Sequence, residues 1–111
     1  MPIVVYEKRT CTTCRNLATL LTERGIDFDT VEYHVEGLGE DELRTLVAKT
    51  RVPARELLRM REDGAADLAD ADDDTVIAAM VERPALLQRP VVVNGDRAVL
   101  ARPIERLDEI L

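Results

Sequence analysis

The apolar residues at the start of the chain change their spacing twice within a short stretch, and this limits the folds that the chain can adopt. Residues 3–6 form a continuous apolar run, which is typical of a strand buried on both faces. Leucines within residues 17–21 follow with the i, i+3, i+4 spacing of an amphipathic helix, and Gly25 is a natural end for it. Residues 28–35 then alternate, which predicts a second strand. Its inward face is expected to carry Val31, Tyr33 and Val35. A strand–helix–strand unit of this kind is parallel, with a right-handed crossover.

The end of the chain returns to strands. Residues 90–93 run into Asn94-Gly95-Asp96, a strong hairpin signal, and residues 97–101 form the return strand. Apolar residues spaced along 104–111 predict a last amphipathic helix. The order βαβ followed by ββα predicts an α/β, thioredoxin-like fold with a mixed four-stranded sheet.

The middle of the chain shows helical signals and no good strand. The expected helices lie around Leu43–Val47, at Ala54–Met60, near Asp67–Ala71, and from Asp72 to just before Pro84. Residues 36–82 hold 13 acids and 6 bases, so the net charge of −7 is concentrated there. We therefore expect a single domain over residues 1–111 with a helical insertion over residues 36–85.

Composition excludes several classes of function. Aromatic residues make up 3% of the chain and the net charge is −7, which argues against direct nucleic-acid binding through stacking or bulk charge. No apolar run approaches the roughly 20 residues of a membrane span. The first residues lack the basic stretch of a signal peptide. We expect a cytoplasmic protein without membrane contact, and a monomer suits this length.

The two cysteines are spaced C-x-x-C, as Cys11 and Cys14. Together with one distant histidine they do not supply a four-ligand zinc site, so no metal is expected. A C-x-x-C motif between a strand and a helix indicates redox chemistry, whereas two small buried cysteines without a role are the alternative. A helix N-terminus stabilises a thiolate, which favours Cys11 as the nucleophile. Neighbouring side chains that could add positive charge or hydroxyl hydrogen bonds are Lys8, Arg9, Thr12, Thr13 and Arg15.

Cys14 has two interpretations of about equal weight. It is either a resolving thiol that attacks an oxidised Cys11 or a small residue that faces the core. Glu7 is a possible acid or base near Cys11, although an exposed loop carboxylate is the better prediction. His34, at the end of the second strand, is expected to be a surface residue.

Arginines beside prolines and at the ends of elements form the second feature. Arg59 is expected to end the short helix, Arg89 precedes Pro90, and Arg102 precedes Pro103. Any one of them alone is best explained as a solvated surface charge. Three that converged would make an oxyanion pocket, because guanidinium groups match tetrahedral oxyanions. Pro90 would face the cysteine if its peptide bond were cis, and it is otherwise an ordinary first residue of a strand.

Four segments in order resemble the glutaredoxin-coupled arsenate reductase family, which shares its fold with the Spx-type regulators. They are Cys11–Asn16, Val52–Arg59, Arg83–Val93 without Ala85, and Leu100–Pro103. The resemblance extends along nearly the whole chain, and the second and fourth segments favour the reductase branch.

The resemblance implies that Cys11 is the nucleophile and that Arg59, Arg89 and Arg102 bind the oxyanion, with Pro90 as a cis proline. Thr13 and Arg15 are further candidates for substrate binding. It implies no bound cofactor, arsenate or a similar oxyanion as substrate, and glutathione or another low-molecular-weight thiol as co-substrate. Glutaredoxin or thioredoxin would be the electron donor.

Two departures from the family pattern matter. Family members usually have Ser where Cys14 stands, and a His where Glu7 stands. Cys14 allows an internal disulfide with Cys11, which could change the electron donor. The Glu7 carboxylate should raise the pKa of a nearby thiol, which the neighbouring basic residues would oppose.

Three functions from different classes are therefore compared. An arsenate reductase is favoured first, on the arginine trio. A general thiol–disulfide reductase that uses the Cys11/Cys14 pair is the second. A redox-sensing regulator of the Spx type, which binds RNA polymerase, is the third, and it fits the segments around Arg59 and Arg102 less well.

Overall fold

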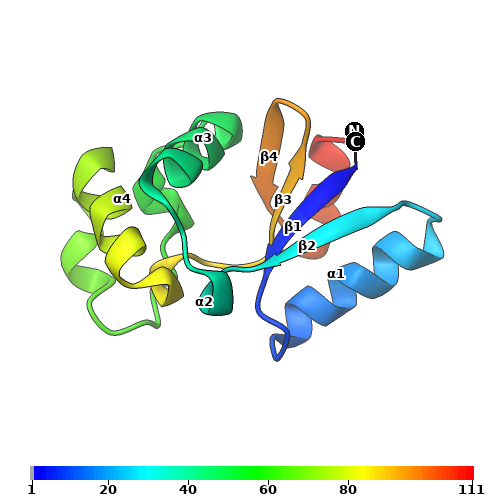
Figure 1. The fold of residues 1–111 in the computed structure, drawn as a ribbon, viewed down its shortest axis with the longest axis horizontal. Helices are drawn as coiled ribbons and strands as arrows, with labels where there is room; N and C mark the ends of the chain where they lie inside the picture. Colours follow the sequence, from blue (N-terminus) through cyan, green and yellow to red (C-terminus); the bar gives the residue numbers. More distant parts are fainter. Residues whose placement is uncertain (1) are drawn as a thin grey trace.

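The computed structural model describes residues 2–111, and a mixed sheet divides it into two layers (Figure 1). The strands are β1 (Ile3–Glu7), β2 (Phe28–Glu32), β3 (Val91–Asn94) and β4 (Arg97–Leu100), in the order β2-β1-β3-β4. β1 is parallel to β2 and antiparallel to β3, which is antiparallel to β4. This is the mixed four-stranded sheet that the sequence predicts.

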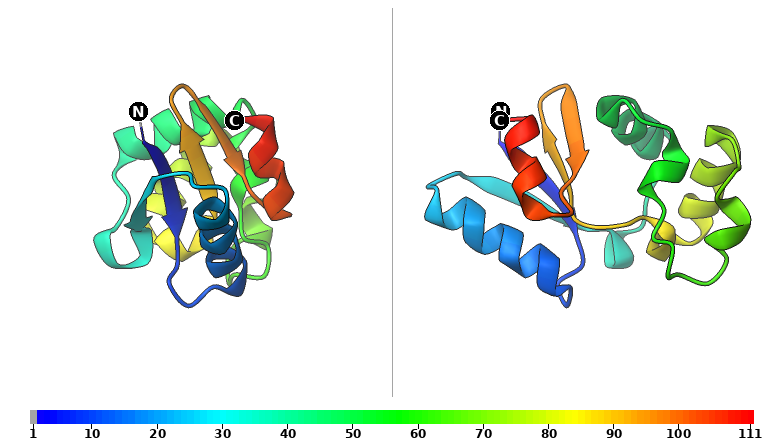
Figure 2. Two further views of the ribbon diagram at one scale, coloured as in Figure 1. Left: turned by 90° about the vertical axis from the view of Figure 1, so that its right-hand side faces the viewer. Right: turned by 180° about the vertical axis from the view of Figure 1, so that it is seen from behind.

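The alternation of side chains along the strands builds two cores, one on each face of the sheet. On one face Ile3, Val5, Val92 and Val99 pack with residues of α1 (Thr12–Glu23) and of the 3₁₀ helix η4 (Ile104–Glu109). On the other face Val91, Val93 and Ala98 pack against the helical segment between β2 and β3. Figure 2 shows α1 and η4 on one side of the sheet and this helical segment on the other.

The helical segment between β2 and β3 contains three α-helices and three 3₁₀ helices. They are α2 (Tyr33–Glu36), α3 (Glu40–Thr50), η1 (Ala54–Leu57), η2 (Ala66–Leu68), α4 (Asp73–Glu82) and η3 (Pro84–Leu86). α4 begins where the acidic run predicts, because the Asp72 carboxylate accepts a hydrogen bond from the Thr75 N–H at 2.9 Å.

The prediction of a strand through residue 35 is wrong. β2 ends at Glu32, and the chain turns into the short helix α2, where Tyr33 is fully buried and Val35 is 80% exposed. Two hydrogen bonds explain the turn. The Tyr33 hydroxyl donates to the Leu87 carbonyl at 2.6 Å, and the Glu32 N–H donates to the Glu36 carboxylate at 2.9 Å. The first of these partners lies far away in sequence and leaves no local signal.

Two predicted helices are shorter or tighter than the sequence suggests. The helix expected at 54–60 is the 3₁₀ helix η1, which ends at Leu57, so Arg59 lies beyond it and does not end it. Hydrogen bonds to a distant segment explain why the helix stops early. The Arg59 N–H donates to the Leu86 carbonyl and the Gln88 N–H donates to the Leu57 carbonyl, each at 2.8 Å. The last helix, η4, is a 3₁₀ helix where an amphipathic α-helix was expected.

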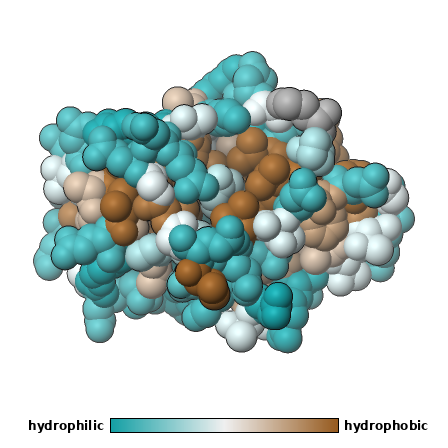
Figure 3. Space-filling model, viewed as in Figure 1, coloured by the Kyte–Doolittle hydropathy of each residue, from teal (hydrophilic) through white to brown (hydrophobic). Residues whose placement is uncertain are grey.

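The surface in the view of Figure 1 is mostly hydrophilic over α3, with a small hydrophobic patch near α4 (Figure 3). A hydrophobic strip near its centre corresponds to a groove of about 360 Å³ between α3 and the sheet, whose lining includes Val4, Leu46 and Val93. Among residues 2–111, no helix has both the length and the apolar character needed to cross a bilayer.

Candidate active site

Cys11 lies where β1 passes into α1, and it is the N-cap residue of that helix. Its N–H donates to the Lys8 carbonyl at 2.9 Å, which closes the turn, and its Sγ accepts the Cys14 N–H at 3.4 Å. Cys11 is half-buried and forms no disulfide with Cys14 in this structure. The sulfur therefore faces the unpaired N–H groups of the first helical turn, as the strand–helix pattern predicts.

The surroundings of Cys11 favour its thiolate. Burial raises the pKa of the Cys11 thiol, but hydrogen bonds from Cys14 and the charged, hydrogen-bonding guanidinium of Arg89 outweigh burial and hold that pKa below its usual value. Thiolate rather than thiol is the nucleophile, so this environment suits attack on an electrophile at neutral pH.

The surroundings of Cys14 have the opposite effect and favour its protonated thiol. It is 1% exposed, and burial raises the pKa of its thiol to about 12, although a hydrogen bond from the Lys8 N–H acts against burial. The neighbouring sulfur of Cys11 and the carboxylate of Glu7 raise it further. At neutral pH Cys14 is thus a protonated thiol that donates to, and does not compete with, the Cys11 thiolate.

Arg89 is the one charged residue among residues 2–111 that is buried, with 7% of its surface exposed. Its guanidinium lowers the pKa of Cys11 by charge and by a hydrogen bond. Its Nε is inaccessible to solvent and has no hydrogen-bond partner within the described chain. A buried cation with an unused donor beside a thiolate is the environment of an anion site, because an unsatisfied buried donor costs free energy until an acceptor arrives.

Arg59 and Arg102 converge on Arg89. The Arg102 guanidinium donates to the Arg89 carbonyl at 3.1 Å, and the Arg59 guanidinium donates to the Gln88 side-chain oxygen at 3.0 Å. Burial lowers the pKa of Arg59, and the nearby charges of Arg89, Arg61 and Arg102 lower it further. The positive charges of the three predicted arginines therefore act on one another, and their sharing of one anion stays a prediction.

The loops that carry these arginines are held by backbone contacts. Ala101 N–H donates to the Pro90 carbonyl at 2.9 Å, and an isolated bridge joins Leu58 to Leu87. The peptide bonds before Pro90 and Pro103 are both cis. These contacts place the segments around residues 59, 89 and 102 at the end of the sheet where the carboxyl end of β1 lies.

The other residues singled out in the sequence lie at varying distances from this cluster. Thr13 is half-buried on the first turn of α1, whereas Arg15 is exposed and its side chain makes no hydrogen bond or ion pair within residues 2–111. A role for either in substrate binding stays a prediction. Glu7 is not an exposed loop carboxylate: it ends β1 opposite Glu32 and is half-buried. Burial and the Glu32 charge raise the pKa of Glu7, although Arg9 opposes them.

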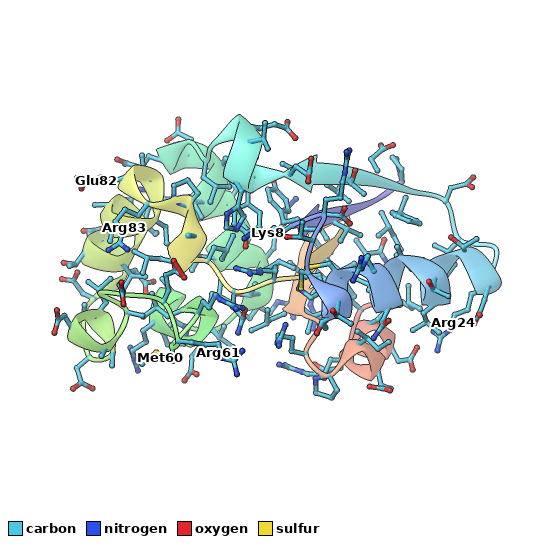
Figure 4. The ribbon with its side chains drawn as sticks, turned by 90° about the horizontal axis from the view of Figure 1, so that it is seen from below. Lys8, Arg24, Met60, Arg61, Glu82 and Arg83 are labelled. Atoms are coloured by element: carbon cyan, nitrogen blue, oxygen red, sulfur yellow. The ribbon has the colours of Figure 1, made fainter. Side chains whose placement is uncertain are left out.

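Two residues at the site were missed by sequence reasoning. Gln88 accepts hydrogen bonds from the Arg59 guanidinium and from the Arg89 backbone N–H at 3.2 Å, so it orients the Arg59 side chain beside the backbone of Arg89. Its only sequence signal is its place directly before Arg89. Arg61 adds charge beside Arg59, and Figure 4 shows Arg61 and Met60 on the segment after η1, with Lys8 nearer the centre of the same face. Residues 2–111 contain no group of three or more histidines, cysteines or carboxylates arranged to hold a metal.

The reactivity of Cys11 can be tested directly with iodoacetamide. We expect the labelling rate to rise with pH and to level off at a lower pH than for an ordinary thiol, because the pKa of Cys11 is lowered. Mass spectrometry of the labelled peptide should place the modification on Cys11 alone in the neutral range, since the pKa of Cys14 is about 12. Equal labelling of both cysteines at neutral pH would contradict this description.

Comparison with known proteins identifies the group to which this arrangement belongs. The sequence model of the ArsC family matches residues 6–110. The chain belongs to the ArsC family. It is 30% identical over 114 residues to the arsenate reductase of Neisseria meningitidis serogroup A, with 98% of this chain and 97% of the relative covered. It is 32% identical to an arsenate reductase of Escherichia coli, with 98% of this chain and 80% of the relative covered.

The solved structure of an arsenate reductase from Vibrio cholerae is similar along the whole chain. Its TM-score is 0.91 at 31% sequence identity, and the match covers 100% of this chain and 98% of that one. The thioredoxin-like fold predicted from the sequence is thereby confirmed, as is the predicted family. In this ArsC-family protein the Cys11 thiol and the arginine cluster occupy one end of that fold.

Proposed function

We propose that this protein is an arsenate reductase in which the Cys11 thiolate attacks arsenate held by Arg59, Arg89 and Arg102. The observation that carries the proposal is the buried guanidinium of Arg89, which lowers the pKa of Cys11. Arg102 bonds to the Arg89 backbone carbonyl, and the charges of Arg89 and Arg102 both act on Arg59. The arsenate reductases among its relatives, at about one-third identity, support the same reaction.

In the first step arsenate binds as a divalent anion and the Cys11 sulfur attacks arsenic. A sulfur–arsenic bond forms, an arsenic–oxygen bond breaks, and the leaving hydroxide takes a proton and departs as water. The guanidiniums neutralise the charge that the thiolate and the oxyanion bring together, which lowers the barrier to attack. Arsenic remains pentavalent in this adduct.

In the second step an external thiolate attacks the Cys11 sulfur. The new sulfur–sulfur bond displaces arsenic, which keeps the electron pair of the sulfur–arsenic bond and leaves as trivalent arsenite. Two sulfurs have each given one electron, and Cys11 remains in a mixed disulfide. Glutathione is the proposed external thiol, and a glutaredoxin then reduces the mixed disulfide.

Cys14 offers a second route for the electrons. Its N–H lies 3.4 Å from the Cys11 sulfur, and its own thiol is adjacent and protonated at neutral pH. If Cys14 attacks the Cys11 sulfur, an internal disulfide forms and thioredoxin becomes the suitable donor. The same pair motivates the alternative function, a general thiol–disulfide reductase.

Arsenite production by purified protein tests the proposal. The protein should be supplied with arsenate and, in separate reactions, with glutathione plus glutaredoxin or with thioredoxin and its reductase. Turnover with the first donor supports the proposed route, and turnover confined to thioredoxin assigns the resolving role to Cys14. Absence of arsenite with every donor, from protein that remains folded, would reject arsenate reduction and favour the thiol–disulfide alternative.

Arg102 gives a prediction for the pocket itself. We expect Arg102→Ala to lower kcat/KM for arsenate by about 10²- to 10³-fold, because one charged donor to the oxyanion is removed. The fold should persist, since Arg102 is only half-buried and its one side-chain hydrogen bond within residues 2–111 goes to the Arg89 carbonyl. Arg106→Ala is the matched control, because Arg106 pairs with Glu109 on η4. Near-normal turnover by Arg102→Ala would exclude Arg102 from the pocket.

A further inference from the structure

Gln88 is the one glutamine of the chain, and the proposed reaction gives it no role. It lies directly before Arg89, on the segment that leads from η3 to β3. Its backbone N–H donates to the Leu57 carbonyl at 2.8 Å, and the Arg59 N–H donates to the Leu86 carbonyl at the same distance. The backbone of Gln88 is therefore held beside the segment that carries Arg59, and its side chain is half-buried.

Two hydrogen bonds fix the orientation of the Gln88 side-chain amide. Its Oε1 accepts one bond from the Arg59 guanidinium at 3.0 Å and another from the Arg89 backbone N–H at 3.2 Å. Both partners can only donate, so the amide atom that faces them is the oxygen and not the nitrogen. With the oxygen occupied by two donors, the position of Nε2 is set as well, because both atoms are bonded to the same carbon.

The nitrogen of this amide is an unused donor. Gln88 Nε2 carries two N–H groups, makes no hydrogen bond within residues 2–111 and remains accessible to solvent. The Arg59 guanidinium, with which the amide is in direct contact, has further N–H groups besides the one that bonds to Gln88. An oxyanion on those groups therefore comes close to Nε2, which can donate to it without moving away from Arg59.

A neutral donor is what the charges of this neighbourhood favour. The cations Arg89, Arg61 and Arg102 already act on Arg59, whereas the Glu62 carboxylate opposes them. A further cation would add to this repulsion among like charges. An amide N–H adds a directional contact to an oxyanion without any charge of its own, because hydrogen bonds weaken steeply when they are misaligned.

We propose that Gln88 binds the substrate oxyanion directly: its Oε1 holds the Arg59 guanidinium, and its Nε2 donates a hydrogen bond to an oxygen of the anion. This inference rests on the oxyanion pocket of the proposed function and adds a neutral donor to its arginines. Loss of the bond should weaken binding of the anion by about tenfold. That is the lower end of the range for a hydrogen bond to a charged partner, because Nε2 is accessible to solvent.

NMR tests the contact itself, because a single glutamine gives one pair of glutamine side-chain amide resonances in a proton–nitrogen correlation spectrum. The spectrum of the intact chain is followed during titration with inorganic phosphate, a tetrahedral oxyanion that the protein does not reduce. We expect one of the two Gln88 amide protons to move downfield and to saturate together with phosphate binding. The Asn94 amide is the internal control, because its nitrogen already donates to the Ile110 carbonyl at 2.6 Å. Phosphate binding that leaves both Gln88 amide protons unmoved would overturn this inference alone.

A double-mutant cycle separates a direct contact from an effect that passes through Arg59. Calorimetry measures the phosphate affinities of wild type, Gln88→Met, Arg59→Met and the double variant. We expect Gln88→Met to lower the affinity by about tenfold in the wild-type chain and still by about threefold or more in Arg59→Met, where no guanidinium is left to position. Equal affinities of Arg59→Met and the double variant would make Gln88 a positioning residue only and would refute the direct bond, as would wild-type affinity in Gln88→Met.

The reactivity of Cys11 shows whether Gln88→Met displaces Arg89 instead. The pH profile of iodoacetamide labelling at Cys11 should stay where it is in wild type, because the Arg89 guanidinium that lowers the pKa of Cys11 is not touched by the Gln88 side chain in this proposal. A profile shifted to higher pH would assign the lost affinity to Arg89 and contradict the proposal. Failure of wild type to bind phosphate would contradict it as well, and arsenite production then decides separately whether the proposed function survives.

Discussion

Cys11→Ser should lower arsenite production by about 10⁴-fold or more, since removal of an attacking group leaves only the binding contribution to the rate. The serine hydroxyl is not ionised at neutral pH, so the hydrogen bonds and the Arg89 charge that stabilise the Cys11 thiolate have no anion to act on. The measurement is single-turnover arsenite release with excess glutathione. Thr19→Ala is the control, because Thr19 is exposed on α1 and its hydroxyl bonds only to the Arg15 carbonyl.

Cys14→Ser separates the two routes for the electrons in the same assay. With thioredoxin as donor we expect turnover to be lost, because the internal disulfide can no longer form. With glutathione and glutaredoxin we expect turnover to continue, because attack by the external thiolate does not need the buried Cys14. Loss of turnover with both donors would show that Cys14 resolves the intermediate in every case.

For the Cys11→Ser variant, rates of arsenite production near those of wild type would exclude Cys11 as the nucleophile.

Arg89→Met is the second variant with a large expected effect, and it should lower activity without a marked loss of stability. We expect kcat/KM for arsenate to fall by about 10³-fold, since the substitution removes a charged donor to the oxyanion and a cation that favours the thiolate. The pH profile of iodoacetamide labelling at Cys11 should shift to higher pH, because the cation that favours the Cys11 thiolate is lost. These two readouts separate loss of the anion site from general damage to the fold.

Stability should not fall in Arg89→Met, because the wild-type guanidinium is 7% exposed and its Nε lacks a partner in the described chain. Replacing the guanidinium by an apolar side chain of similar length removes the cost of burying its charge, but it also removes the attraction to the Cys11 thiolate, so the free energy of unfolding should change by no more than about 1 kcal/mol. Urea unfolding measures this change. Arg55→Met, at an exposed arginine on η1, controls for loss of charge and should leave both activity and stability near wild type. A marked loss of stability in Arg89→Met would mean that Arg89 is a structural residue.

The sequence predicts the sheet well because its signals are local. The apolar run at residues 3–6, the alternation that begins at residue 28 and the Asn94-Gly95 pair each lie within the element that they specify. Gly95 takes a φ of +64° at the first position of the hairpin turn, a conformation that glycine adopts without strain. The helix that starts after Cys11 is likewise marked by its own N-cap.

The errors have a common cause, which is that long-range contacts override local preference. Tyr33 follows the alternation of β2, yet its hydroxyl bonds to Leu87 and turns the chain into α2. Arg59 has helical neighbours, yet its N–H pairs with the Leu86 carbonyl beyond the end of η1. No pattern within a few residues contains either partner, so these features could not be predicted from spacing.

The same division applies to the site. The position of Cys11 follows from local sequence, because a cysteine directly before an amphipathic helix occupies the N-cap wherever the rest of the chain lies. Which cation acts on Cys11 depends instead on the packed fold. Arg15 is four residues away and exposed, whereas Arg89 is far along the chain and buried beside the sulfur. Charge–charge interactions in a protein depend on distance and burial and not on separation along the chain. The arginine cluster therefore emerges only once the segments around residues 59, 89 and 102 are packed together.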